Sequence, residues 1–77
     1  MDTECKVLSD LCPGDTACVR CLHLSGAIRQ RLLDLGLIEG TSVQCLGRSP
    51  AGDPTAYLIR GAVIALRDSD SCEIEVI

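Results

Sequence analysis

Two cysteines three residues apart, followed closely by a histidine, are the first side chains of this sequence that could do chemistry. Cys18 and Cys21 have the spacing with which two thiolates hold zinc or an iron–sulfur cluster, and His23 adds a nitrogen. A tetrahedral site usually takes its second pair of ligands from another such motif, which the sequence lacks, so Cys45 or Cys72 would have to complete it. In a regular strand Cys18 and Cys21 point to opposite faces. We therefore expect one core thiol, one surface thiol and no bound cofactor, and rank a transition-metal site second.

Other arrangements that carry catalysis are missing from the sequence. A redox-active pair of cysteines opens a helix next to a βαβ unit, whereas the segment around Cys18 alternates like a strand. His23 is the only histidine, and no serine has the strand-turn-helix context of a nucleophile. Gly36 and Gly40 lack the lysine and the Ser/Thr of a phosphate-binding loop. We therefore expect a protein that is not an enzyme.

Composition limits the partners and the compartment. The 77 residues carry a formal net charge of −4 and a single lysine, which argues against nucleic acid, because Lys and Arg supply most of the affinity for phosphates. No apolar run approaches the roughly 20 residues of a membrane span, and the acidic residues 1–4 do not resemble a secretion signal. We expect a cytoplasmic protein without membrane insertion, whose six cysteines are reduced. The sequence gives no indication of oligomeric state.

The alternation of apolar and polar residues predicts a mainly β protein with one short helix between the first and second strands. The expected elements are strands at residues 16–22, 42–48, 56–60, 62–67 and 72–77, a helix at 26–35, a proline loop at 49–54 and a polar turn at 68–71. In the first strand, Ala17, Val19 and Cys21 are expected to share one face. Five short strands and one helix, in a single domain of residues 1–77, suggest a small barrel, whose closure removes exposed edges.

The predicted helix has recognisable ends. Ser25 is expected to be its N-cap, with a hydroxyl that accepts from a free backbone N–H. Gly36 occupies C′, where a positive φ is needed, and Leu37 then covers Leu32 as in a Schellman motif. The expected inner face is Ile28, Leu32 and Leu35. So short a helix is not stable alone, and it must dock on the sheet.

The order of several short motifs resembles one known family. The motifs are Leu8-Ser9-Asp10-Leu11, Gly14, residues 31–40, residues 49–54, Gly61, Ala65-Leu66-Arg67 and Ile74-Glu75-Val76. Together they resemble the ferrous iron transport protein A (FeoA) type of SH3-like domain. The resemblance implies a small cytosolic β-barrel that serves bacterial ferrous iron uptake as an accessory or regulatory protein. It also implies a partner, the membrane transporter FeoB, which carries a cytosolic GTPase domain.

We expect the protein to work by protein–protein contact, with the helix and its following turn as the first candidate surface. Apolar side chains beside arginines are typical of such surfaces. The candidate residues are Arg29, Arg31, Leu33, Leu37 and Ile38, and, second, Asp53 and Pro54 of the proline loop. A groove for proline-rich peptides is not expected, because Tyr57 is the only aromatic residue. Two alternatives stay open: a zinc or iron sensor that uses Cys18 and Cys21, and a stand-alone regulatory domain of an iron-dependent repressor system, where a similar fold occurs.

Overall fold

The structure is a computed structural model that describes residues 6–77. Residues 1–5 lie outside the described residues. They include Cys5 and the acidic start of the chain, on which the expectation of no secretion signal rests. The elements in chain order are β1 (Lys6–Val7), the 3-10 turn η1 (Leu8–Asp10), β2 (Thr16–Leu22), α1 (Gly26–Asp34), β3 (Ser42–Arg48), β4 (Thr55–Ile59), β5 (Ala62–Leu66), α2 (Asp68–Ser71) and β6 (Ile74–Val76). No helix in this part of the chain is long and apolar enough to cross a membrane.

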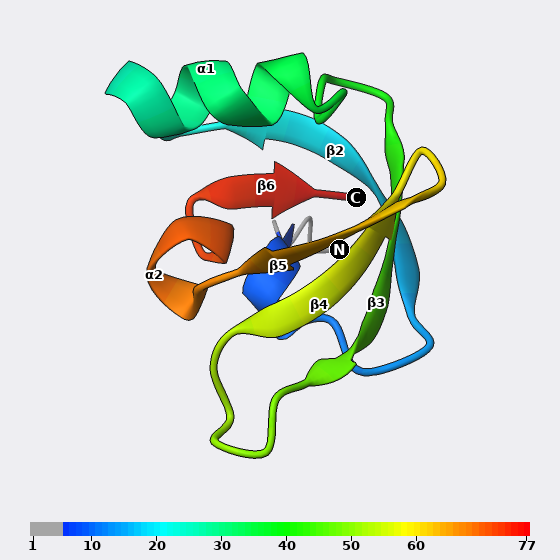
Figure 1. Cartoon of the computed structure of the whole chain (residues 1–77). Helices are drawn as coiled ribbons and strands as arrows, with labels where there is room; N and C mark the ends of the chain where they lie inside the picture. The colour runs from blue at the N-terminus through cyan, green and yellow to red at the C-terminus, as the bar shows by residue number, and fades with distance from the viewer. Residues whose placement is uncertain (1–5) are drawn as a thin grey trace.

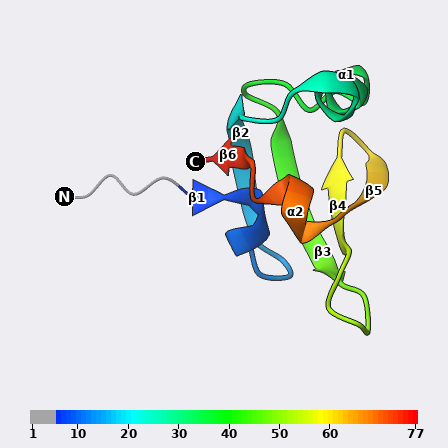
Figure 2. The same ribbon diagram turned by 90° about the vertical axis from the view of Figure 1, so that its left-hand side faces the viewer.

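The strands of residues 6–77 form one antiparallel sheet in the order β1-β6-β2-β3-β4-β5. The sheet curls on itself, with α1 at one end and the loop between β3 and β4 at the opposite end (Figures 1 and 2). The expected mainly β fold, with a helix between the first two long strands, is confirmed. The bounds of β2 and β3 are those that the alternation predicts. The strands expected at 56–60 and 72–77 lie at Thr55–Ile59 and Ile74–Val76, the latter shortened because Cys72 is the C-cap of a short helix.

Two further elements were not expected, because they depend on residues far away in the chain. β1 is an additional, sixth strand, which pairs with Glu75 and Val76 of β6. The expected polar turn at residues 68–71 is instead the one-turn helix α2. The carboxylate of Asp53 accepts a hydrogen bond from the backbone N–H of Asp68 at 2.9 Å, which satisfies one of the free donors at the start of α2.

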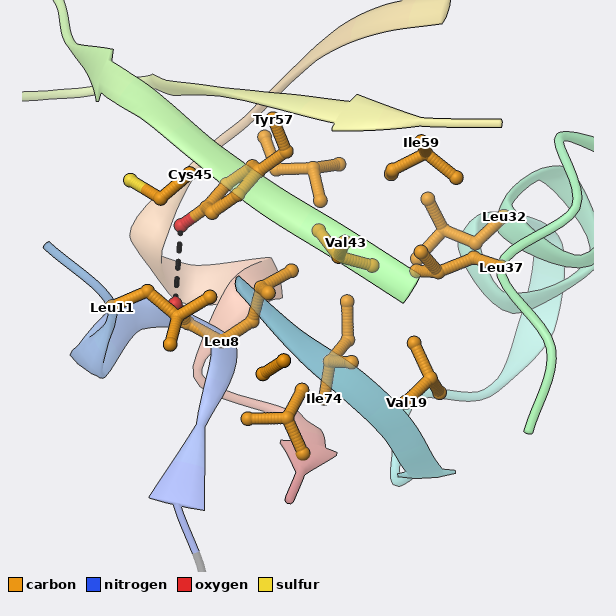
Figure 3. Close-up of a cluster of buried hydrophobic side chains, with 13 residues drawn as sticks. Leu8, Leu11, Val19, Leu32, Leu37, Val43, Cys45, Tyr57, Ile59 and Ile74 are labelled. Atoms are coloured by element: carbon orange, nitrogen blue, oxygen red, sulfur yellow. Dashed lines mark hydrogen bonds between the residues drawn. The ribbon is translucent and has the colours of Figure 1, made fainter. Parts of the chain in front are cut away.

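Aliphatic side chains and one tyrosine fill the core inside the curled sheet. The buried members are Leu8, Leu11, Ala17, Val19, Leu32, Leu37, Val43, Cys45, Tyr57, Ile59, Leu66, Ile74 and Val76. The hydroxyl of Tyr57 donates to the carbonyl oxygen of Leu8 at 3.4 Å, which connects β4 to η1 (Figure 3). Leu32 and Leu37 lie side by side at one end of the core, and through them α1 and the segment after it are attached to the sheet (Figure 3).

Candidate functional site

α1 ends in the Schellman motif that the sequence predicts. Gly36 has a φ of +97°. Its N–H donates to the carbonyl oxygen of Leu33 at 3.0 Å, and the N–H of Leu37 donates to that of Leu32 at 2.9 Å. These two bonds satisfy carbonyls that a helix end otherwise leaves free. At the other end Ser25 is the N-cap, as expected, but its hydroxyl makes no capping bond within residues 6–77, so the prediction of a side-chain cap is wrong.

Thr41 locks the turn after α1, and sequence reasoning missed it. Its hydroxyl donates to the carbonyl oxygen of Gly36 at 2.8 Å and accepts from the N–H of Ile38 at 3.3 Å. The backbone N–H of Thr41 also donates to the carbonyl oxygen of Ile38 at 3.0 Å. The residue is buried and its hydroxyl bonds are partly buried, so they help to hold the turn in one conformation. A hydroxyl residue shortly after a helix-ending glycine is the signal that could have indicated it.

The end of α1 exposes different leucines from those expected. Leu37, a predicted contact residue, is fully buried, because the Schellman geometry folds it back onto Leu32; its predicted exposure is wrong. Leu35, predicted to lie on the inner face, is 38% exposed, because it is the C-cap, where the regular helical stripe ends. Leu33 is half-buried, and Ile38 is 47% exposed. The apolar surface at this end of the molecule is therefore made chiefly by Leu35 and Ile38.

Arginines accompany these apolar side chains. Arg29 and Arg31 are exposed on α1, and neither forms an ion pair within the described structure. The side chain of Arg60, from the hairpin between β4 and β5, lies so close to Gly36 that a Cβ there would clash with it. Asp34 and Glu39 are also exposed here, so the three arginines give this end a small excess of positive charge, whereas the whole chain has a net charge of −4. Such a surface suits an acidic, partly apolar partner.

The second predicted surface lies far from the first. Asp53 and Pro54 are exposed in the loop between β3 and β4, which lies at the opposite end of the molecule from α1 (Figures 1 and 2). Besides the bond from Asp53 to Asp68, this loop is held by Arg48, whose guanidinium donates to the carbonyl oxygen of Gly52 and to the carboxylate of Asp68, each at 3.3 Å. The fold therefore does not bring the two predicted surfaces together. Asp53 also has a structural role, because its carboxylate accepts the hydrogen bond from the N–H of Asp68.

A β-bulge changes the faces of the cysteines in β2. The register with β6 shifts between Val19 and Cys21, so Arg20 is an extra residue and the inside-outside alternation slips by one position. Cys18 and Cys21 are consequently both exposed. The expectation of one core thiol and one surface thiol, with Cys21 on the face of Val19, is wrong for this reason.

The other metal candidates are not gathered around these two thiols. Nε2 of His23 lies 3.0 Å from one carboxylate oxygen of Glu75, and Nε of Arg20 lies 3.3 Å from the other. Cys45 is in the core, where burial raises the pKa of its thiol, and Cys72 is exposed just after α2. Residues 6–77 contain no cluster of three or more His, Cys, Asp or Glu side chains that could hold a metal ion.

Comparison with known families decides what kind of domain this is. The FeoA domain model matches residues 6–77, which is the whole described chain. The protein belongs to the FeoA domain family. The family and the SH3-like fold that the sequence motifs predict are thereby confirmed, and the FeoA family is implicated in ferrous iron transport.

Relatives of this FeoA domain occur both alone and as part of longer chains. The Fe(2+) transport protein A/Fe(2+) transporter FeoB fusion protein of Porphyromonas gingivalis is 33% identical over 69 residues, which are 90% of this chain and 8% of the fusion protein. The solution structure of FeoA from Chlorobium tepidum superposes with a TM-score of 0.88 at 35% identity, covering 92% of this chain and 68% of that one. FeoA of Stenotrophomonas maltophilia, crystallised with zinc and described as a prokaryotic SH3 domain protein, gives 0.78 at 30% identity, over 94% and 89% of the two chains.

Proposed function

We propose that this protein is a non-enzymatic accessory of ferrous iron uptake, which works in the cytoplasm by contact with the cytosolic part of an FeoB-type transporter. The observation that carries the proposal is the fusion of the FeoA and FeoB modules in one polypeptide of Porphyromonas gingivalis. Joining two modules by a linker holds them at high effective concentration. A separate FeoA chain has to reach the same proximity by binding, so it needs a contact surface.

We infer that this surface is formed by exposed side chains of α1 and of the turn after it. Arg29, Arg31, Leu33 and Ile38 belong to it as the sequence suggests, and the exposure of Leu35 adds that residue. Leu37 is removed from the set, because a fully buried side chain cannot touch a partner without unfolding the turn. The two exposed apolar side chains provide surface that loses water on binding, and the arginines beside them orient the partner by charge. Both contributions favour a specific contact.

The loop residues Asp53 and Pro54 form a second, separate candidate contact. Both are exposed, but they lie at the other end of the fold. A transporter domain that touches α1 would have to extend along the molecule to reach them as well. We therefore rank the surface on α1 first.

Co-purification and iron uptake test the proposal together. Tagged protein is used to capture the cytosolic part of the transporter encoded by the same organism, and ferrous iron uptake is measured in a strain that lacks the chromosomal copy. Ile38→Asp places a charge on the proposed surface, while Leu46→Asp places the same charge on β3, where the leucine is similarly exposed at 42% against 47%. We expect capture and uptake to fall with Ile38→Asp and to persist with Leu46→Asp. Failure of wild-type protein to capture the transporter would sink the proposal.

A further inference from the structure

β5 is an apolar strand at the end of the sheet in the described structure. It reads Ala62-Val63-Ile64-Ala65-Leu66, without a charge, a proline or a bulge, and Val63 is 66% exposed. Natural proteins usually blunt such edges, because the unpaired backbone groups pair readily with another strand. The opposite edge strand, β1, carries Lys6, a charge of the kind that blunts an edge. β5 is therefore the edge at which a further strand could add.

The hairpin geometry shows which backbone groups of β5 face the open side. Arg60 and Gly61 form a two-residue turn with φ of 52° and 85°, so the flanking residues Ile59 and Ala62 exchange hydrogen bonds. Bonded and non-bonded pairs alternate along an antiparallel ladder. The N–H and C=O groups of Val63 and Ala65 consequently point away from β4, towards the open edge.

A groove of about 180 Å³ lies between α1 and β5. Its apolar walls include Ile28 and Leu35 from α1 and Ile64 and Leu66 from β5. Side chains alternate between the two faces of a strand. A strand added beside β5 would thus place every second side chain in this groove, where aliphatic groups leave water. Backbone pairing and an apolar groove are the two features by which sheet edges bind extended peptides.

The charges at the groove select the partner. Arg31 and Arg67 line it, and Arg60 lies at the start of β5; none of the three forms an ion pair among residues 6–77. Asp70 is the one acidic side chain in the lining. A second copy paired antiparallel through β5 would bring Arg60 of one chain towards Arg67 of the other, so like charges would meet.

An acidic segment has the complementary charge. Acidic side chains that alternate with aliphatic ones lie on the face of the strand away from the groove, beside Val63 and Ala65. Arg67 continues that alternation in an extended conformation, so it is the arginine that such side chains would meet.

We propose that β5 binds an extended partner segment in which acidic and aliphatic residues alternate, as an added antiparallel strand whose aliphatic side chains enter the groove beside α1. The groove shares Arg31 and Leu35 with the contact surface on α1, but the edge of β5 lies outside that surface, and the ligand is any peptide chain that presents such a segment.

A titration followed by ¹⁵N–¹H NMR tests this binding. The probe is an eight-residue peptide of alternating Glu and Val with blocked ends. We expect saturable shifts of the Val63 and Ala65 amides and slower hydrogen exchange at both, since these are the groups that gain partners. The same peptide with N-methyl groups on alternate residues should not bind, because it lacks the backbone donors.

Three variants test separately whether peptide binding depends on the open edge of β5, on the charge of Arg67, or on charge elsewhere on the sheet. Val63→Pro removes an N–H that faces the open side, so the fold should persist while binding is lost. Arg67→Glu should weaken binding about fivefold, the upper range for one exposed ion pair. Lys6→Glu reverses a charge on the opposite edge strand and should leave binding unchanged.

Three results would overturn the proposal. The first is an absence of shifts at Val63 and Ala65 at millimolar peptide. The second is equal binding of a Lys-Val peptide of the same length. The third is the appearance of the same shifts on concentrating the protein alone, which would make a second copy the occupant. The titration contains no transporter, so peptide binding can fail while the co-purification succeeds, and the reverse is equally possible.

Discussion

Replacing Gly36 with alanine is the sharpest test of the joint at the end of α1. The φ of +97° is costly for any residue with a Cβ, roughly 1–2 kcal/mol. The new Cβ would also clash with the side chain of Arg60, and moving that side chain off its rotamer costs about 0.5–1.5 kcal/mol. Alanine also lowers the conformational entropy of the unfolded chain, which offsets about 0.4–1 kcal/mol of this loss of stability. We expect a net loss of about 1–2 kcal/mol in the free energy of unfolding.

Gly14→Ala is the matched control for this change. Gly14 has nearly the same φ, +95°, but a Cβ there would meet no atom within 4 Å. Both substitutions therefore share the backbone cost and the unfolded-state gain, and their difference isolates the contact with Arg60. We expect Gly36→Ala to be the more destabilising by about 0.5–1.5 kcal/mol, and the double variant Gly36→Ala, Arg60→Ala to lose that excess.

Urea unfolding measures these differences. A domain of this size has a total stability of about 4–12 kcal/mol and an m-value near 1 kcal/mol per molar urea, so Gly36→Ala should lower the midpoint by about 1–2 M. Equal midpoints for Gly36→Ala and Gly14→Ala would refute the close packing of Arg60 on the helix end. A wild-type midpoint for both would refute the positive φ values themselves.

Three further predictions concern stability. Leu37→Ala should cost about 2–5 kcal/mol because it empties a core position, and Ile38→Ala less than about 1 kcal/mol because the side chain is half-exposed; equal losses in urea unfolding would contradict the assigned burial. Thr41→Val should cost about 0.5–1.5 kcal/mol, because it removes two hydrogen bonds of the hydroxyl while the N–H of Ile38 stays bonded to the carbonyl oxygen of Gly36. It should also speed hydrogen exchange at the N–H of Ile38, and unchanged exchange would contradict a role of Thr41 in holding the turn. Burial raises the pKa of Cys45 above its ordinary 9.0, so the unfolded chain loses this proton at lower pH than the folded one, and stability should decline as the pH rises through 9. Cys45→Val should flatten that alkaline decline in a series of melting temperatures, and an unaltered slope would show that the thiol titrates normally.

The sequence predicts best what is decided by neighbouring residues. The bounds of β2 and β3 follow from alternation between turn residues, and the Schellman end follows from glycine and leucine at the correct positions after Leu32. The same motif already implied that Leu37 is buried. Leu37 is therefore not available as a contact residue, since the C″ side chain of this motif packs back on the helix.

The features that sequence reasoning missed depend on distant partners. β1 exists because residues near the start of the chain pair with β6, and α2 is supported by the carboxylate of Asp53, fifteen positions earlier. The bulge at Arg20, which exposes Cys21, is visible only in the register between β2 and β6. The groove beside β5 likewise requires knowing that α1 lies next to the sheet edge. Local patterns carry none of this information.

Calorimetry can measure the affinity of the wild-type protein and of two variants for the cytosolic part of the FeoB-type transporter. Wild-type protein and Leu46→Asp should bind equally, and Ile38→Asp should bind at least about tenfold more weakly, a change of 1.4 kcal/mol. Circular dichroism should show the same fold for all three. Equal affinities for Ile38→Asp and Leu46→Asp would contradict the assignment of the α1 surface, and no binding by wild-type protein would contradict the account as a whole.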